Sequence, residues 1–294
     1  MTSEAWPRMS VDEWGATLDT VRTWCGLVGR TRLALARGQG PGWDAPLYVT
    51  SAGLTTSLMP LGVRGGLEVV LDLQAHQLVM RLTDGRDRRM RLARRSGDDL
   101  GSEYLARLAE LEVEVELGPW PAGRAAASPV PENAGSASYD AHAVQQYFRA
   151  LVSAHRVLTR FRGDLRGRPS PVQFSWGAFD LAVTLVSGRP APAQPDEVPH
   201  RPHRVVVEAN RQELSRCGYW PGGADEGLFF VHVHPQPRGF RDHAPTSVDA
   251  YFDEDLGEFV LPYADVRRAV DPDAHALRFV TEIHAVATAD WPVA

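Results

Sequence analysis

The sequence predicts an α+β protein built from two similar halves, each a long helix packed on an antiparallel sheet. Apolar residues recur at helical spacing at the start of each half, and short β-rich segments bounded by turn residues follow both stretches. A segment rich in Gly, Pro, Ala and Ser separates them. We therefore expect an N-terminal half over residues 1–120, a linker over 121–138, and a C-terminal half over 139–294 that carries the functional site.

A long amphipathic helix is expected from Val11 to about Arg37, because its apolar residues fall on one stripe. The stripe consists of Trp14, Leu18, Val21, Cys25, Val28 and Leu35. Gly38 and the Gly/Pro cluster that follows end this helix.

The rest of the N-terminal half is expected to be mainly sheet. Residues 46–92 divide into short β-rich segments separated by turn signals, which is typical of an antiparallel meander. Residues 98–111 begin with two aspartates, as a helix N-terminus prefers, and are expected to form a second helix. The alternating segment 113–117 is then expected to be a strand.

The C-terminal half repeats this plan. Asp140 is expected to cap a helix with one apolar stripe that ends near Gly163. A last helix is expected from Asp271, its cap, to about Ala289, with a proline in its first turn. Strand-like segments between these helices cover 171–186, 204–209 and 228–234.

Local sequence matches suggest that the halves arose by duplication. Two pairs of segments match at nearly the same offset, 27–33 with 151–157 and 46–50 with 171–175. The alternative is that any helix followed by a strand that starts with proline gives such matches by chance. Each first helix also contains an arginine, Arg32 or Arg156, which needs an acceptor nearby because an unpaired buried charge is costly. A duplicated fold commonly buries a pocket between its halves.

Composition excludes several classes of function. The net charge is −6, which argues against a nucleic-acid partner, and the basic run 81–95 is expected to form two solvated strand faces. No lysine is present, so a Schiff base with PLP and a P-loop lysine are impossible, and no Gly-rich dinucleotide motif occurs. The high Ala, Gly and Arg content without lysine suggests a bacterial source. With two distant cysteines and no long apolar segment, the chain is expected to be cytoplasmic and without a membrane partner.

The segment 170–190 is the most informative for chemistry. If Val172, Phe174 and Trp176 share one face of a strand, Gln173 and Ser175 share the other, and after Gly177-Ala178 the residues Asp180, Ala182 and Thr184 form a comparable small, polar face. A carboxylate among small polar residues can line a cleft as acid or base, so Asp180 is the first candidate for catalysis. The alternative is a structural ion pair with an arginine such as Arg156 or Arg189.

Two histidines suggest that a divalent metal is the cofactor. No nucleotide or PLP is expected, because the motif and the lysine that bind them are missing. Alternation places His232 and His234 on one side of a strand, where two imidazoles can point at one ion. Glu213 is the candidate for a third ligand, with Asp180 next. Two surface histidines near the end of a strand are the alternative interpretation.

Aromatic residues flank these polar candidates. Trp176, Tyr219 and Trp220 are expected to wall a pocket beside Glu213, although large aromatic side chains pack cores more often than they contact ligands. Glu213 is the second candidate acid or base. The candidates for positioning a polar substrate are Gln173, Gln212 and Arg189.

Four motifs resemble an uncharacterised bacterial family, domain of unknown function 5996, over most of the chain. They read PLYVTxxGLTTS, SPVxFxWGxFDLAVTxxSGRxAP, ELSxxGYWPGG and LGEFVLPYxxVR. The resemblance implies no activity, because the family has no established reaction. Departures from the family pattern are Gln173 for a histidine, Gln212-Glu213 for His-Glu, Leu185 for an arginine, and His232-Val233-His234-Pro235 for Tyr-x-Tyr-Pro. Losing two imidazoles would remove an acid/base pair or metal ligands, because Gln cannot titrate.

The leading functional hypothesis is a small-molecule enzyme of hydrolase, lyase or isomerase type that uses Asp180 and Glu213 in an aromatic pocket. A non-catalytic small-molecule-binding protein derived from such an enzyme is the alternative. A structural or interaction protein is the third hypothesis, and it predicts no cavity between the halves. The first hypothesis requires that the two carboxylates converge in a hollow open to solvent.

Overall fold

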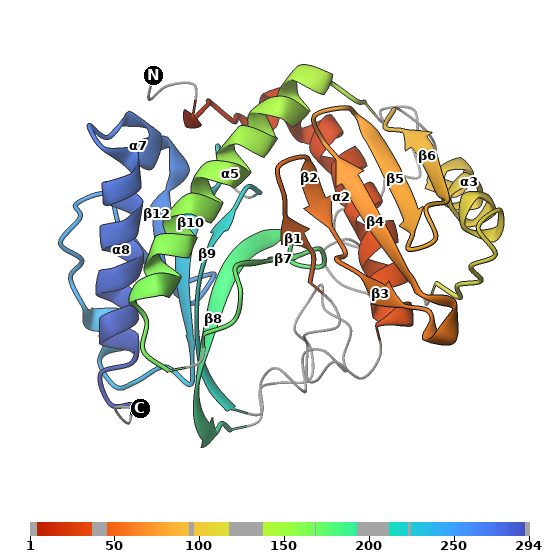
Figure 1. Ribbon diagram of the computed structural model, residues 1–294. Helices are drawn as coiled ribbons and strands as arrows, with labels where there is room; N and C mark the ends of the chain where they lie inside the picture. The colour runs from red at the N-terminus through yellow and green to blue at the C-terminus, as the bar shows by residue number, and fades with distance from the viewer. Residues whose placement is uncertain are drawn as a thin grey trace.

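The computed structural model describes residues 5–36, 46–93, 97–117, 138–167, 169–192, 212–222 and 225–291. It confirms the α+β class: two antiparallel sheets are each preceded and followed by helices (Figure 1). The expected linker over 121–138 lies outside the described residues except for Ser138.

The N-terminal half contains the expected helix, meander and second helix. Helix α2 spans Val11–Leu35 and packs on strand β4, and helix α3 spans Gly97–Ala109 (Figure 1). The strands are β1 (Tyr48–Val49), β2 (Gly53–Thr55), β3 (Met59–Pro60), β4 (Gly66–Asp72), β5 (Gln77–Leu82) and β6 (Asp87–Arg91), in the order β1-β2-β4-β5-β6 with β3 paired to β4. The prediction of a strand over 113–117 is wrong. Val113 is buried in the core, but this segment pairs with no described strand.

In the C-terminal half, helices α5 (Ala141–Asp164) and α8 (Pro272–Ala287) begin at the expected caps. Asp140 accepts a hydrogen bond from the backbone of His142 at 2.8 Å, and Asp271 accepts one from Ala274 at 3.0 Å. A short helix, α7 (Tyr263–Arg268), precedes α8. Short polar side chains thus fix the N-termini of both long helices.

The C-terminal sheet has the order β11-β12-β10-β9-β8-β7. Its strands are β7 (Gln173–Ser175), β8 (Asp180–Pro190), β9 (Gln212–Trp220), β10 (Leu228–His234), β11 (Tyr251–Asp253) and β12 (Glu258–Pro262). The single strand expected over 171–186 is two strands joined by a turn, and the one expected over 204–209 lies outside the described residues. Helices α5 and α8 cover one face of this sheet (Figure 1).

The two halves meet along one core. Among the described residues, one cluster of buried hydrophobic side chains contains members of both halves. Strand β1 lies beside β7, where Leu47 and Phe174 exchange backbone hydrogen bonds of 2.8 and 2.7 Å (Figure 1). Leu47 and Phe174 belong to segments 46–50 and 171–175, whose sequences match each other. These two matching segments therefore lie antiparallel where the two halves meet. The duplication itself stays a prediction.

Both helix arginines have the expected acceptors. Arg32, buried in α2, donates to the backbone carbonyl of Thr56 and lies over the ring of Tyr48. Arg156 donates two hydrogen bonds to Asp273 at 2.6 and 2.8 Å. Each guanidinium therefore has an acceptor, and Asp273 also supplies a counter-charge to Arg156.

A glycine in α2 makes room for Trp176, which the sequence placed in a pocket wall. A Cβ atom built on Gly29 would lie 2.2 Å from the indole, so the tryptophan packs directly on the helix backbone. At Gly15 of the same helix the nearest atom would be 3.9 Å away. Trp176 is buried, and it holds the β7–β8 turn against the N-terminal half.

We expect Gly29→Ala to destabilise the protein by about 1–3 kcal/mol, because the new methyl group must displace the indole. Gly15→Ala is the matched control and should stabilise by up to about 1 kcal/mol through helix propensity. Urea unfolding of both variants measures the difference. Equal stability of the two variants would contradict the packing of Trp176 on α2.

Candidate functional site

The two faces of the C-terminal sheet have different environments. Ser215 of β9 lies 2.8 Å from the Nδ1 atom of His284 on α8, so the odd-numbered residues of β9 face the helices. Arg216 and Gly218 therefore face the other way. We call this opposite side the polar face, made of Gln173, Ser175, Asp180, Ala182, Thr184, Arg216, Gly218, Trp220, Phe230, His232 and Glu258.

The register places both sets of small, polar residues, those before and those after the turn, on this one face. Gln173 lies opposite Ala182, and Ser175 lies opposite Asp180. The turn between the two strands ends at Phe179, which has a left-handed backbone with φ of 57°. This conformation is uncommon for a bulky residue. The Phe179 ring packs edge-on against Phe174, while Asp180 begins the next strand on the polar face.

Asp180 forms a buried ion pair with Arg216. An Nη2 donor of the guanidinium bonds to the Oδ1 atom of Asp180, and Nη1 donates to the hydroxyl of Thr184 at 3.3 Å. Asp180 is 6% exposed and Arg216 is 8% exposed. The sequence left open that Asp180 is an ion-paired residue, and the structure shows that pairing, with Arg216 in place of Arg156 or Arg189 as the partner.

Small residues give the ion pair its space. Arg216 lies opposite Thr184, and the next pair on this face toward Asp180 is Ala182 with Gly218. A Cβ atom on Gly218 would lie 2.6 Å from the ring of Phe230, which therefore covers this glycine. A larger residue here would displace that ring.

Two polar atoms around the ion pair have no hydrogen-bond partner within the described part of the chain. They are the Oε1 acceptor of Gln173 and the Nε donor of Arg216, and both atoms are buried. Buried polar atoms are partnered in the great majority of native structures, so each exception calls for an explanation. One donor and one acceptor on the same sheet face can together bind a group that carries the complementary pair.

Glu213 does not join Asp180, so the expected convergence of the two carboxylates is wrong. Leu181 pairs with Tyr219 and Val186 pairs with Leu214, so Asp180 and Glu213 lie near opposite ends of β8 and β9. A rise of about 3.3 Å per residue puts them on the order of 20 Å apart. They also lie on opposite faces of the sheet, because alternation separates odd from even positions of β9.

Arg189 and Ser187 hold Glu213 at the far end of the sheet. Arg189 donates to its carboxylate at 2.7 Å and Ser187 at 2.8 Å. Desolvation raises the pKa of Glu213, but the two hydrogen bonds and the positive charge of Arg189 together outweigh it, so the pKa is lowered. Glu213 and Arg189 therefore form an ion pair away from Asp180, and Gln212, exposed at the start of β9, lies at the same end.

Tyr219 and Trp220 lie on opposite faces, so they do not wall one pocket together. Tyr219 is fully buried on the helix side beside Phe229. Trp220 belongs to the polar face, at the end where Asp180 lies. A Cβ atom on Gly222 would lie 2.6 Å from Nη2 of Arg22 and 3.1 Å from Nε1 of Trp220, so α2 supplies an arginine beside this indole.

The histidine pair shares a face as expected, but the proposed third metal ligands are wrong. Glu213 is on the other face, and Asp180 is bonded to Arg216. His232 instead lies 3.6 Å from Glu258, and His234 lies 3.0 Å from the carbonyl of Pro192. Within the described ranges, no group of three or more His, Cys, Asp or Glu side chains is placed to hold a metal ion.

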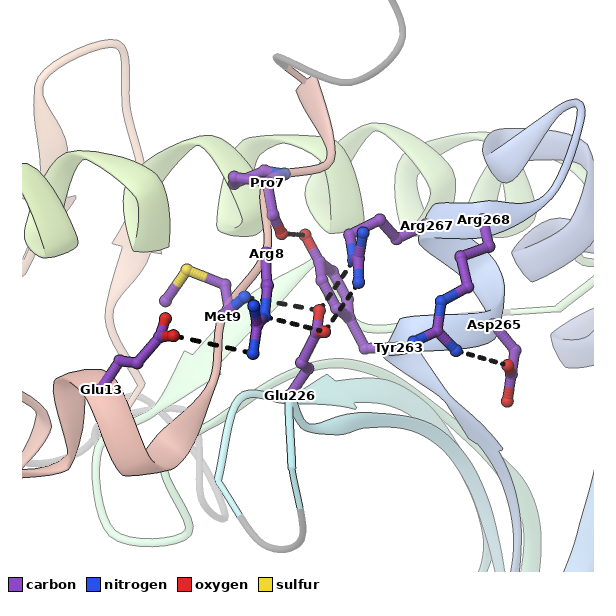
Figure 2. A network of polar contacts seen from close by, with 9 residues as sticks. All are labelled: Pro7, Arg8, Met9, Glu13, Glu226, Tyr263, Asp265, Arg267 and Arg268. Carbon is purple, nitrogen blue, oxygen red and sulfur yellow. Dashed lines mark hydrogen bonds and ion pairs between the residues drawn. The ribbon is translucent and has the colours of Figure 1, made fainter.

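Glu226 forms a second buried carboxylate network that the sequence analysis missed (Figure 2). It accepts two hydrogen bonds of 2.8 Å from Arg267, and one of 3.4 Å from the backbone of Met9. Arg8 approaches the same carboxylate at 3.9 Å, and the hydroxyl of Tyr263 donates to the carbonyl of Pro7. The network thus fastens the N-terminal segment 5–10 to the C-terminal half.

A signal for these missed residues was present in the sequence. Arg216 lies inside an alternating strand next to Cys217, and a charge there needs a buried partner. Arg267 and Tyr263 both belong to the LGEFVLPYxxVR motif. Glu226, the partner of Arg267, lies 41 residues away from it, and spacing alone does not identify that partner.

Among the described helices, none is both long enough and apolar enough to cross a membrane. No curated protein and no solved structure matches the chain significantly. A family model described as a family of unknown function, DUF5996, matches residues 6–294, which is nearly the whole chain. The expected resemblance is confirmed, and the chain belongs to the DUF5996 family.

Proposed function

We propose that this protein binds a small polar molecule on the polar face, at the Asp180–Arg216 ion pair. One observation carries the proposal: Gln173 and Arg216 each keep a buried polar atom without a partner among the described residues. An unpaired buried polar group costs about 1–3 kcal/mol, which a ligand with matching groups would recover. The two unpaired atoms therefore lower the stability of the unliganded fold, and ligand binding would offset this loss.

The ligand would be a neutral molecule that carries a donor and an acceptor close together. Asp180 and Arg216 already compensate each other's charge, so an ion would add an uncompensated charge to a buried site. Gln173 needs a donor and the Nε atom of Arg216 needs an acceptor. Primary amides, lactams and ureas present both groups at one edge.

Catalysis is the second candidate, and the left-handed backbone at Phe179 favours it. Strained backbone next to a buried carboxylate is common at active sites, where the surrounding fold maintains it. Asp180 would act alone as acid or base in a hydrolysis, elimination or isomerisation. It would first have to leave Arg216, and breaking a buried ion pair costs about 3–5 kcal/mol. We therefore favour binding over catalysis.

A bacterial cytoplasm is the proposed location. Cys25 and Cys217 are both free thiols in the core, as expected for a protein from a reducing compartment. The absence of lysine among the basic residues is the compositional support for a bacterial source.

A thermal-shift screen tests the binding proposal with acetamide, 2-pyrrolidinone and N-methylurea as probes. We expect at least one probe to raise Tm, and N,N-dimethylacetamide, which lacks the donor, to have a smaller effect. Gln173→Met should weaken binding about tenfold through one lost hydrogen bond. Gln212→Met, the same change at an exposed position of this sheet, is the control.

The outcomes separate the two candidates. A probe that stabilises the protein and is recovered unchanged by NMR supports binding, and a probe that is converted supports catalysis. The proposal is overturned if no probe raises Tm, or if Gln173→Met binds as well as Gln212→Met does.

A further inference from the structure

Two arginines of this protein pair with a carboxylate through the same edge of the guanidinium. Arg156 bonds to Asp273 through Nε and Nη2, at 2.6 and 2.8 Å. Arg267 bonds to Glu226 through the same two atoms, both at 2.8 Å (Figure 2). This paired arrangement is frequent, because the planar guanidinium matches the two oxygen atoms of a carboxylate. In both pairs the Nε donor is therefore satisfied.

Arg216 pairs with Asp180 in a different way. Its Nη2 atom bonds to the carboxylate, but its Nε donor has no partner among the described residues. The other terminal nitrogen, Nη1, donates to the hydroxyl of Thr184 at 3.3 Å. The side chains of Arg216 and Asp180 are only 10% and 8% exposed, so an unpaired donor here lowers the stability of the fold.

Thr184 is held in place by its backbone. It lies directly opposite Arg216 in the register of β8 and β9. On its other side the backbone N–H of Thr184 donates to the hydroxyl of Ser170 at 2.9 Å, and its carbonyl accepts from the backbone N–H of Ser170 at 2.8 Å. These bonds do not involve the side chain of Thr184. Its hydroxyl therefore offers Nη1 an acceptor at a fixed position, and a change of this side chain leaves the backbone bonds intact.

We propose that Thr184 is a positioning residue of the binding site, because its hydroxyl holds Nη1 and thereby keeps Nε of Arg216 open for the ligand. The inference rests on the proposed function, in which Nε donates to the acceptor of the ligand. Without the hydroxyl, the guanidinium would turn and bind both oxygens of Asp180 through Nε and Nη2, as the two other arginines do with their carboxylates. The arginine would then be satisfied, and the ligand would have no donor.

A purely structural role for Thr184 gives the opposite effect on stability. If the hydroxyl only stabilised Arg216, Thr184→Val would lose one hydrogen bond and lower Tm. In the proposed role, the variant exchanges a bond to a hydroxyl for a second bond to a carboxylate, which is the stronger acceptor. We therefore expect a Tm equal to or above that of the wild type, together with weaker ligand binding.

Ligand titration, thermal unfolding and a crystal structure of Thr184→Val test this role. We expect the variant to bind acetamide, 2-pyrrolidinone and N-methylurea about tenfold more weakly, through one lost hydrogen bond. The crystal structure should show Nε and Nη2 of Arg216 both bonded to Asp180. Thr184→Ser keeps a hydroxyl and should restore binding. Thr55→Val is the matched control: its hydroxyl donates to Glu68 at 2.7 Å in the N-terminal sheet, so this variant should have a lower Tm and normal binding.

Any one of three results for Thr184→Val overturns the inference: a lowered Tm, unchanged binding, or a crystal structure in which Nε stays unpaired. Failure of the proposed function gives a different pattern, because none of the three probes would then bind the wild type. In that case the Tm and the crystal structure of the variant still decide whether the hydroxyl of Thr184 sets the orientation of Arg216.

Discussion

Replacing Glu226 by glutamine should lower the free energy of unfolding by about 3 kcal/mol. The carboxylate is 6% exposed and accepts both hydrogen bonds of Arg267, whose side chain is 22% exposed. The amide keeps the size of the side chain but loses the charge, so a largely buried guanidinium is left without its counter-ion. Urea unfolding of the wild type and the variant measures the loss.

The matched control is an exposed ion pair on α7, the helix that also carries Arg267 (Figure 2). In this pair Arg268 lies 3.5 Å from Asp265, and the two side chains are 64% and 33% exposed. An exposed pair of this kind contributes at most about 1 kcal/mol, so Asp265→Asn should have a small effect. A Glu226→Gln variant as stable as Asp265→Asn would show that the buried pair does not stabilise the fold.

The same variant should loosen the N-terminal segment selectively. Met9 donates its backbone N–H to Glu226, and Arg8 contacts the same carboxylate. Hydrogen exchange should therefore rise over residues 5–10 before it rises in the sheets. Uniform exchange across the chain would mean that Glu226 supports global stability and does not fasten this segment.

Alternation and capping predicted most of the fold, because both depend on neighbours along the chain. Asp140 and Asp271 cap helices as expected, and Gln173 shares a face with Asp180. Alternation, however, fixes only the face of a residue and not its position along the strand. This is why Asp180 and Glu213 were expected to meet, although the register places them near opposite ends of the sheet.

The centre of the site could not be predicted, since it depends on strand neighbours. Residues 212–220 carry no strong strand pattern and were not expected to form a strand, so no expectation placed Arg216 opposite Thr184 and within reach of Asp180. The Glu226–Arg267 pair joins residues 41 apart in the sequence. Such pairs follow from the topology of the sheet and helices, which local patterns leave open.

His284 should make the protein markedly less stable in mild acid. Its imidazole on α8 is 8% exposed, contacts Ser215, and packs edge-on against Phe161 at 5.3 Å. Burial lowers the pKa of His284 from 6.5 to about 4. Above pH 6.5 the residue is neutral in both states, so it opposes folding only at lower pH.

The sign of the effect follows from proton uptake. Between pH 6.5 and pH 4 the unfolded chain binds a proton at this histidine that the folded chain does not bind. The free energy of unfolding therefore falls as the pH is lowered through this range. Near pH 4.5 the loss amounts to about 2.5 kcal/mol. His284→Gln keeps a group that can hydrogen-bond to Ser215 but cannot titrate, and it should remove this loss.

Comparing the wild type with His284→Gln at each pH isolates the contribution of His284, because the carboxylates titrate in both proteins. At pH 7.5 the variant should be the less stable, by about 1 kcal/mol for altered packing. By pH 4.5 the difference should have shifted by about 2.5 kcal/mol in its favour, so that the variant is the more stable. His275→Gln on the same helix should leave the contribution of His284 intact. A stability difference between wild type and His284→Gln that stays constant with pH would show that the folded protein protonates this histidine as readily as the unfolded chain does.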